Sequence, residues 1–464
     1  MKFLPASLVE LAYLVTAVTF IIGIKRLGAP ATARSGNQWA AAGMLLAIVA
    51  TFFSQRFGNY LLIGGGIVVG GALGAVSARR VKITAMPQMV ALFNGMGGGA
   101  AALIAAGQYR LLAAGGATVA PSATFTVLLS AVMGAISFSG SLIAFGKLQE
   151  WLSGHPLRYR AQHLVNGALL ALVLALGLAL LVVGTPALFA AYLVAAVLLG
   201  VLVVLPIGGA DMPVVIALLN SCTGLAAAVT GFLLGNNVLV VAGALVGASG
   251  AILTQAMSRA MNRSVVNVLF GSFGTSAGSV AGSAGKMGAV HATTPEDVAV
   301  MLAYAREVII VPGYGLAVAR AQHAVKELAD LLEQRGVEVK YAIHPVAGRM
   351  PGHMNVLLAE ADVPYSELYT MEQINPEFPH ADVALVVGAN DITNPAARSS
   401  NGSPISGMPI LDVDAAAAVV VLKRSMGAGF AGIDNELYVN PKTRMLFGDA
   451  RASLGQLVAA VKQV

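Results

Sequence analysis

The sequence predicts a polytopic α-helical membrane domain followed by a Rossmann-like α/β domain with a doubly wound parallel sheet. Hydrophobic residues make up 57% of the 464 residues and charged residues only 11%, against roughly 25% charged residues in soluble proteins. Residues 1–263 hold 14 Lys and Arg against three acids (net +11), whereas the remainder holds 14 against 19 (net −5). In that acidic part, a β-branched run at 307–311 leads through Pro312 into a glycine-rich turn, as a dinucleotide-binding unit begins.

Nine apolar runs are each long enough to cross a bilayer as a helix. They lie near residues 5–24, 37–54, 59–78, 86–106, 123–146, 164–183, 186–206, 213–234 and 237–258. The first run extends about 20 residues, to Lys25, which is long for the core of a signal peptide. We therefore expect it to be retained as a membrane helix.

Basic residues in the predicted loops orient these helices, because cytoplasmic loops carry an excess of Lys and Arg. One side holds Lys25, Arg26, Arg34, Arg79, Arg80, Lys82, Lys147, Arg158, Arg160, Arg259 and Arg263, and the other holds Lys2, Arg56 and Arg110. The N-terminus is therefore expected outside, and nine spans put everything after residue 263 in the cytoplasm. The overall charge of +6 sums a basic membrane part and an acidic soluble part, so it does not predict a nucleic-acid partner.

Polar residues inside the predicted spans are candidates for function, because polarity in hydrocarbon is costly unless it is paired. Asn94 and the pair Asn220-Ser221 lie in mid-span, and Asp211 precedes the eighth span. Two interpretations stay open: hydrogen-bonded bridges between helices, or a path for protons or ions. The seven histidines, at 155, 163, 291, 323, 344, 353 and 380, all fall outside the predicted spans.

The predicted membrane domain covers 1–263, a Gly/Ser-rich linker covers 264–290, and the α/β domain covers 291–464. In the α/β domain Thr294 is a predicted N-cap and Pro295 suits the first helical position. A helix from about 316 to 335 should follow the glycine turn, and an amphipathic run at 453–463 closes the chain. Strands are expected at 307–311, 337–343, 383–389, 408–413, 418–423 and 444–450. Apolar strands alternating with helices indicate a parallel sheet covered on both faces.

The fingerprint after the first of these strands reads Gly313-x-Gly315-x-x-Val318. The two glycines allow a tight turn and a close approach of backbone N–H groups to a pyrophosphate at a helix start. Valine replaces the third glycine, a position that concerns helix–strand packing more than phosphate contact. The strand–turn–helix context favours a dinucleotide site.

Charges at the strand ends bear on which dinucleotide is bound. An NAD site usually places an acid after the second strand, but this strand ends at 343–345 without one. Lys423, Arg424 and Ser425 follow a later strand and suit a 2′-phosphate, although an ordinary basic loop tip is an equally good interpretation. Arg349 and the pair Asn390-Asp391 also follow strands, where ligands bind in such folds. No hydrolytic triad or metal-ligand cluster is apparent, which fits hydride transfer.

Seven segments together resemble the β subunit of the proton-translocating NAD(P)+ transhydrogenase along the whole chain. They are MPQMVALFNGMGGGAA, GGADMPVVIALLNS, VPGYGLAVARAQ, AGRMPGHMNVLLAEA, VVGANDITNPAA, VLKRSMGAGFAG and LFGDA. The resemblance implies a cytoplasmic domain that binds NADP(H) beneath a proton-conducting membrane domain. It also implies a partner α subunit that binds NAD(H) and adds transmembrane helices, a dimer of the heteromeric complex, and the bacterial inner membrane as location.

The resemblance also implies roles for single residues. The expected cofactor-binding residues are Gly313, Tyr314, Gly315, Val318, Arg349, Lys423, Arg424, Ser425, Gly448 and Asp449. The expected catalytic residues are Asp391, near the nicotinamide, and its neighbour Asn390. The expected proton path is Asn94, Asp211, Asn220 and Ser221, and no metal is expected.

Two departures from the family pattern and two alternative functions complete the expectations. Some members have histidine in place of Asn94, and some have tyrosine in place of Phe430. Because this chain has no histidine within its predicted spans, we expect the titrating group to lie on a partner helix packed against the spans 86–106 and 213–234. One alternative is a membrane transporter whose nucleotide domain only senses NADP(H). The other is a membrane-anchored dehydrogenase whose helices are mere support.

Overall fold

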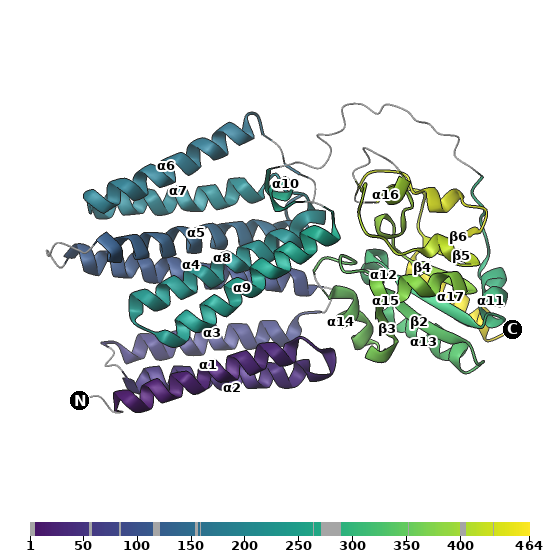
Figure 1. Cartoon of the computed structure of the whole chain (residues 1–464), viewed down its shortest axis with the longest axis horizontal. Helices are drawn as coiled ribbons and strands as arrows, with labels where there is room; N and C mark the ends of the chain where they lie inside the picture. Colours follow the sequence, from purple (N-terminus) through teal and green to yellow (C-terminus); the bar gives the residue numbers. More distant parts are fainter. Residues whose placement is uncertain are drawn as a thin grey trace. The chain divides into compact units, whose positions relative to one another are not determined.

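The protein is described by a computed structural model covering residues 5–54, 58–82, 85–114, 121–153, 156–157, 159–262, 264–270, 289–350, 352–399, 405–429 and 431–464. The chain divides into two compact units. One comprises Met1–Pro206 with Val215–Thr254, and the other Ile207–Val214 with Gln255–Val464. Figure 1 shows the long helices of the first and the sheet of the second. Most of the predicted linker, at 271–288, lies outside the described residues.

The described residues hold nine helices long and apolar enough to cross a membrane. They are α1 (Ala6–Leu27), α2 (Pro30–Ser54), α3 (Tyr60–Arg80), α4 (Met86–Ala114), α5 (Pro121–Leu148), α6 (Gln162–Val182), α7 (Pro186–Val204), α8 (Met212–Leu234) and α9 (Asn237–Ala260). This set confirms the nine predicted spans, although several ends differ. Hydropathy reports where side chains are apolar, whereas a helix continues as long as its backbone hydrogen bonds do.

One shifted end corrects a prediction about histidine. Because α6 begins at Gln162, His163 lies in the first turn of an apolar helix rather than in the loop before it. Its side chain is exposed. The described histidines therefore avoid the middle of the helices but not their ends.

Helices α4 to α7 pack around an apolar cluster. The ring of Tyr109 on α4 stacks on Phe189 of α7 with centroids 4.1 Å apart. The hydroxyl of Tyr192, also on α7, donates to the carbonyl oxygen of Leu128 on α5 at 3.0 Å. These contacts bury both tyrosine side chains almost completely while one polar group finds a main-chain partner.

Glycine allows α8 and α9 to approach closely. A Cβ added at Gly224 of α8 would lie 2.2 Å from the amide nitrogen of Gly247 on α9. A Cβ at Gly250 would lie 2.6 Å from the amide nitrogen of Ser221. Small residues bring membrane helices together in this way. Helix α3 differs, because none of its side chains is buried and a Cβ at Gly64 would meet nothing within 4 Å.

The second unit contains a parallel sheet whose described strands run in the order β3-β2-β1-β4-β5-β6. The strands are β1 (Glu307–Pro312), β2 (Glu338–Ile343), β3 (Leu368–Thr370), β4 (Val383–Val387), β5 (Ala418–Lys423) and β6 (Thr443–Phe447). In register, Ile310 of β1 lies between Tyr341 of β2 and Leu385 of β4. This confirms the doubly wound parallel sheet. Strand β3 was not predicted, because three residues at a sheet edge, none of them buried, leave little pattern.

Helices and single turns of 3₁₀ helix connect and cover these strands. They are α11 (Pro295–Ala303), α12 (Tyr314–Ala319), α13 (Gln322–Glu333), α14 (His353–Glu360), η3 (Tyr365–Glu367), α15 (Met371–Ile374), η4 (Asn375–His380), η5 (Asp391–Thr393), α16 (Ala396–Ser399), η6 (Val413–Ala415), η7 (Glu436–Val439) and α17 (Ala450–Val461). Two further short elements, η2 (Gly209–Asp211) and α10 (Val265–Phe270), directly precede α8 and follow α9 in the chain, respectively. Helices α11, α12 and α13 all pack against α17. The Thr294 hydroxyl accepts from the Asp297 amide at 3.2 Å, which confirms the predicted N-cap.

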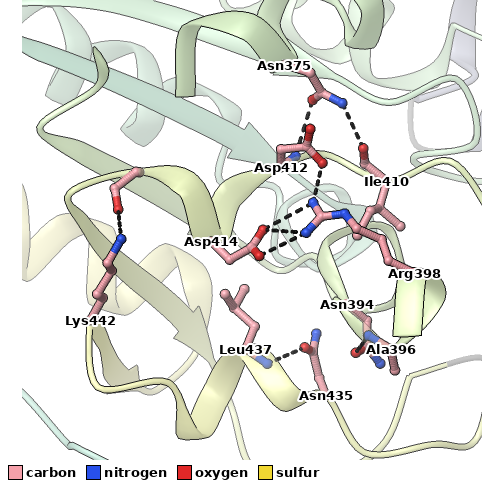
Figure 2. Close-up of polar contacts among 11 residues, drawn as sticks. Asn375, Asn394, Ala396, Arg398, Ile410, Asp412, Asp414, Asn435, Leu437 and Lys442 are labelled. Atoms are coloured by element: carbon pink, nitrogen blue, oxygen red, sulfur yellow. Dashed lines mark hydrogen bonds and ion pairs between the residues drawn. The ribbon is translucent and has the colours of Figure 1, made fainter. Parts of the chain in front are cut away.

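The predicted strand at 408–413 is wrong. The side chain of Asn375 forms the hydrogen bonds that a neighbouring strand would otherwise make with this run. It donates to the Ile410 carbonyl at 3.0 Å and accepts from the Asp412 amide at 3.2 Å (Figure 2). The amide of Leu411 donates to the Ile392 carbonyl at 2.9 Å. An apolar run thus stays buried as irregular chain, because side chains and neighbouring loops satisfy its backbone.

Candidate functional site

The strand order reverses between β1 and β4, so the chain leaves these two neighbours toward opposite sides and a crevice opens beyond their carboxyl ends. The two turns that follow them are bonded to each other. The amide of Gly313 donates to the Val387 carbonyl, and the amide of Gly315 donates to the Gly388 carbonyl, both at 2.9 Å. The glycine fingerprint therefore lies at the topological switch point of the sheet.

The glycines are needed first for contact between these two turns. A Cβ at Gly313 would lie 2.4 Å from the amide nitrogen of Ala389, and a Cβ at Gly315 would lie 2.7 Å from the Cα of Gly388. Gly388 adopts a φ of +66°, which favours glycine. Gly313 and Gly315 were predicted to allow a tight turn and the approach of a pyrophosphate, whereas Gly388 was not predicted. The structure shows a further reason for glycine at these positions: the backbones of the two turns pass too close to each other for a side chain.

The helix predicted over 316–335 is broken in two. Helix α12 ends at Ala319, Arg320 takes a left-handed conformation with φ +51°, and α13 begins at Gln322. The side chain of Val318 is 50% exposed, so it does not pack between helix and strand as predicted. It faces the crevice instead.

All the candidate nucleotide-binding residues line this crevice. Those lining it are Gly313, Tyr314, Gly315, Val318, Arg349, Asn390, Asp391, Lys423, Arg424, Ser425, Gly448 and Asp449. They come from the segments after β1, β2, β4, β5 and β6, which lie far apart in the sequence. Parallel strands bring their carboxyl ends to one edge of the sheet, and this explains the convergence.

Two buried histidines shape the loop after β2 that carries Arg349. His344 Nδ1 accepts from the Val346 amide at 3.2 Å, so its Nε2 carries the proton that faces the Pro409 carbonyl oxygen at 2.9 Å. His353 Nδ1 accepts from the Arg349 amide at 3.0 Å. Burial lowers the pKa of each histidine to about 4, so both are neutral acceptors near pH 7.

This loop places Arg349 against the glycine turn. Its guanidinium carbon lies 4.6 Å from the centroid of the Tyr314 ring, within range of a cation–π contact. The first residue of α12 and the loop after β2 are thereby joined at the crevice, which both residues line. A cation at this position can face a phosphate while the ring limits its movement.

The basic group beyond β5 consists of one constrained and one open cation. Lys423 Nζ donates to the Gly427 carbonyl and lies 4.7 Å from the centroid of the Tyr438 ring. Burial lowers its pKa, while Asp391 and Asp434 oppose that shift. Arg424 and Ser425 are exposed, and Arg424 makes no hydrogen bond or ion pair with any described residue. An anion in the crevice would therefore find an unengaged guanidinium.

The Asn390-Asp391 turn meets the segment that follows β5. Asp391 Oδ2 accepts from the Ala431 amide at 3.0 Å. A Cβ at Gly429 would lie 2.4 Å from Asp391 Oδ1. With its oxygen turned toward them, the Asn390 side-chain amide accepts from the Gly429 amide at 2.7 Å and from Lys423 Nζ at 3.2 Å. These contacts hold two loops face to face at the crevice.

Asp449 has a structural partner of its own. Its carboxylate accepts from the amides of Arg451 and Ala452, at 3.1 and 3.3 Å, and so caps the start of α17. Gly448 precedes it, and a Cβ there would lie 2.4 Å from the Ser453 hydroxyl. Both residues line the crevice while their local contacts fix the β6–α17 turn.

In the membrane helices, Asn94 belongs to a polar seam between α4, α5 and α8. Its Nδ2 donates to the hydroxyls of Ser141 at 2.9 Å and Ser137 at 3.3 Å. Ser137 also contacts Thr223 Oγ1 at 2.5 Å and donates to the Leu219 carbonyl at 2.9 Å. Asn94 Oδ1 is buried and has no hydrogen-bond partner within the described part of the chain. Ser137, Ser141 and Thr223 were not predicted, because serine and threonine are common in membrane helices.

The other proton-path candidates lie in different surroundings. Ser221 donates to the Gly247 carbonyl at 2.8 Å and so joins α8 to α9. Asn220 is half-buried, one turn from Thr223 on α8. Asp211 is 2% exposed and lies in η2, directly before α8. The structure thus places Asn94 in the polar seam between α4, α5 and α8, whereas the hydroxyl of Ser221 bonds to α9.

An apolar helical domain joined to a doubly wound sheet with a basic crevice at its switch point defines an integral membrane protein with a dinucleotide-binding fold. The family model described as NAD(P) transhydrogenase beta subunit matches residues 9–460, so the chain belongs to that family. The expected family is thereby confirmed, and the protein is one subunit of a heteromeric membrane oxidoreductase. The family does not support a transporter that only senses a nucleotide.

Two relatives share this name. The NAD(P) transhydrogenase subunit beta of Rhodospirillum rubrum is 50% identical over 463 residues, which covers 98% of this chain and 99% of the relative. A protein of the same name from a designated strain of Rhodospirillum rubrum is also 50% identical, with the same coverage. This chain therefore spans nearly the whole length of these two relatives.

Proposed function

We propose that this chain binds NADP(H) in the crevice at the switch point and couples hydride exchange with NAD(H) on a partner subunit to proton movement through its helices. The convergence of all twelve nucleotide candidates on one crevice, in a chain of the transhydrogenase beta family, carries this proposal. NADP(H), when bound, supplies the hydride acceptor or donor. The chain's own residues bind it, orient it and exclude water.

The charge distribution supports NADP(H) over NAD(H). The carboxyl end of β2, where an NAD site usually holds an acid, is occupied by the buried neutral His344. The carboxyl end of β5 presents Lys423, Arg424 and Ser425, which suit a 2′-phosphate. Arg349 and the turn at Gly313 also line the crevice, and a pyrophosphate would fit against them. Asp391 and Asn390 would then act at the nicotinamide end of the nucleotide.

The binding assignment is tested with Arg424→Ala in the full chain. Losing a charge-assisted contact should weaken NADP+ binding by about 1.5–3 kcal/mol and leave the weaker NAD+ binding unchanged. Calorimetry measures both affinities. Lys462→Ala, which removes an exposed cation paired with Glu327, is the matched control. Equal NADP+ affinity in wild type and Arg424→Ala would remove Arg424 from the site.

The division of labour between subunits follows from the single dinucleotide fingerprint in this chain. Direct hydride transfer needs the reacting carbons within roughly 3–3.5 Å, so the partner's NAD(H) must dock against the crevice. We assign the partner to an NAD(H)-binding α subunit with further transmembrane helices, in a dimeric complex of the bacterial inner membrane. The excess of basic loops supports an external N-terminus and a cytoplasmic nucleotide domain.

The proton route is proposed to follow the polar seam around Asn94 and to pass Asn220, one turn from Thr223 on α8, with Asp211 at its cytoplasmic mouth. Asparagine does not titrate, so these residues serve as relays that orient water or a neighbouring group. The buried Asn94 Oδ1 supports this role, since it offers an acceptor that no described residue uses. The titrating group is assigned to a partner helix packed beside α4 and α8, because coupling near pH 7 needs a side chain such as histidine.

The coupled activity is tested in proton-tight vesicles with this chain alone and with its NAD(H)-binding partner. Neither hydride transfer nor pumping is expected from the chain alone, and both are expected from the complex. NADH-to-NADP+ turnover by the purified chain alone would contradict the two-subunit division. Turnover in the complex that is indifferent to a collapsed proton gradient would indicate an anchored dehydrogenase instead.

A further inference from the structure

Two buried asparagines connect the Asp391 turn to the far end of the segment that covers it. We call residues 424–429 and 431–434, between β5 and η7, the cover segment; six of its residues line the crevice: Arg424, Ser425, Gly427, Ala428, Gly429 and Ala431. Its first end is fixed by the β5–β6 ladder, where Lys423 pairs with Phe447. Its second end joins no strand. What holds that end decides how firmly the segment covers a bound nucleotide.

Asn394 and Asn435 hold that end by reciprocal hydrogen bonds. Asn394 lies after the Asp391 turn, and its Nδ2 donates to the Asp434 carbonyl at 3.0 Å. Asn435 follows the cover segment, and its Nδ2 donates to the Asn390 carbonyl at 3.0 Å. Each side chain therefore reaches from its own loop to a main-chain oxygen of the other.

The two side chains are themselves locked in place. Asn394 Oδ1 accepts from the Ala396 amide at 3.1 Å, and Asn435 Oδ1 accepts from the Leu437 amide at 2.9 Å (Figure 2). Asn394 is fully buried and Asn435 is 5% exposed. The oxygen of each side-chain amide is thus bonded within its own loop, and the nitrogen is bonded to the opposite loop. Because both side chains are buried, losing one of these hydrogen bonds would be costly.

We propose that Asn394 and Asn435 are positioning residues that fasten the second end of the cover segment to the Asp391 turn and so set how slowly NADP(H) leaves the crevice. The inference rests on the proposed nucleotide site. Neither asparagine lines the crevice, so each acts through the backbone it holds: Asn435 on Asn390, and Asn394 on Asp434. The pair forms a clasp at the one end of the segment that the sheet does not anchor.

The structure supplies a matched control in the same domain. Asn375 makes the same pair of bonds, since its Nδ2 donates to the Ile410 carbonyl at 3.0 Å and its Oδ1 accepts from the Asp412 amide at 3.2 Å. It touches neither the cover segment nor the Asp391 turn through these bonds. Figure 2 shows the three asparagines in one view. Replacing Asn375 removes the same chemistry without touching the clasp.

The test replaces each asparagine by aspartate in the full chain in lipid nanodiscs. Aspartate keeps the oxygen that the local amide needs but turns a second oxygen toward the main-chain carbonyl, so only the cross-link is lost. Release of bound NADPH into excess NADP+, followed by its fluorescence, should be about three- to tenfold faster for Asn394→Asp and Asn435→Asp. Asn375→Asp should release at the wild-type rate. The release rate of the double variant, relative to wild type, should be smaller than the product of the two single-variant accelerations, because either loss alone opens the clasp.

Several outcomes would overturn the inference. Wild-type release rates in both clasp variants would do so, and so would equal acceleration by Asn375→Asp, which would mark a general loss of stability. Wild type that binds no NADPH would remove the proposed site itself, and the clasp with it. If a buried carboxylate lowers the unfolding temperature, Asn435→Ser keeps an oxygen for the Leu437 amide without the charge and should still release faster.

Discussion

Gly313 illustrates how a single residue serves two requirements at once. Its amide donates to Val387 and its missing side chain lets the turn after β1 cross the turn after β4. The atoms that a Cβ would meet belong to the backbone of Gly388 and Ala389, which cannot rotate away as a flexible side chain can. The fingerprint made Gly313 predictable, but its closest neighbours, Gly388 and Ala389, belong to the turn after β4, far along the chain.

Gly313→Ala should therefore destabilise the nucleotide domain by about 1–3 kcal/mol and abolish NADP+ binding. The reason is overpacking against fixed backbone at the switch point. Denaturant unfolding and calorimetry measure the two effects. Gly455→Ala is the opposite case, since Gly455 lies in α17 with nothing within 4 Å, and it should stabilise by about 0.5–1 kcal/mol. A stable, nucleotide-binding Gly313→Ala variant would refute the steric account.

At the scale of elements, the loop between β2 and α14 depends on histidines that must stay neutral. His344 and His353 each use Nδ1 as an acceptor for a loop amide, and a proton on that nitrogen would break the bond. Burial lowers both pKa values to about 4; Glu372 partly opposes this for His344, whereas Arg349 adds to it for His353. The loop that carries Arg349 is thus held by two titratable groups with depressed pKa values.

Stability of the nucleotide domain should fall as the pH drops from 6.5 toward 4. The unfolded chain takes up the histidine protons first, because its histidines titrate near 6.5 whereas the folded ones titrate near 4. Each histidine should contribute up to about 1.4 kcal/mol per pH unit within this window. Unfolding midpoints at pH 7 and pH 5 measure the slope. His344→Gln should flatten it, and an equal slope in that variant would contradict the assignment.

For the whole molecule, the seam around Asn94 connects three membrane helices through hydroxyl groups. Asn94 on α4, Ser137 on α5 and Thr223 on α8 are joined by hydrogen bonds. Asn220 lies one turn from Thr223. None of these side chains titrates near neutral pH, which is why the proposed complex assigns the proton carrier to a partner helix.

Asn220→Leu should abolish proton pumping by the complex while NADP+ binding to the full chain stays intact, because leucine cannot relay a proton. Acidification in vesicles and calorimetry separate the two effects. Phe232→Leu, on the exposed face of the same helix, is the control and should pump normally. Normal pumping by a complex whose partner has no intramembrane histidine or carboxylate would overturn the assignment, and Asp211 would become the leading candidate.

The sequence by itself determined the nine spans, the parallel sheet and several residues of the crevice, because each leaves a local signal. Apolar runs of about 20 residues predict membrane helices, and residues after strand ends must meet at one edge of a parallel sheet. The end of α12 at Ala319 and the irregular chain at 408–413 left no such signal. There a left-handed Arg320 and the side chain of Asn375 override a helical or strand pattern.

Only the tertiary structure decided which groups meet across long separations. The close approach of Gly388 to Gly315, the seam that joins Asn94 to Ser137, and the clasp of Asn394 and Asn435 all pair residues from different elements. A single glycine, serine or asparagine is common in any sequence and carries no mark of its partner. Such contacts depend on register, twist and loop geometry, which arise only when the whole domain packs.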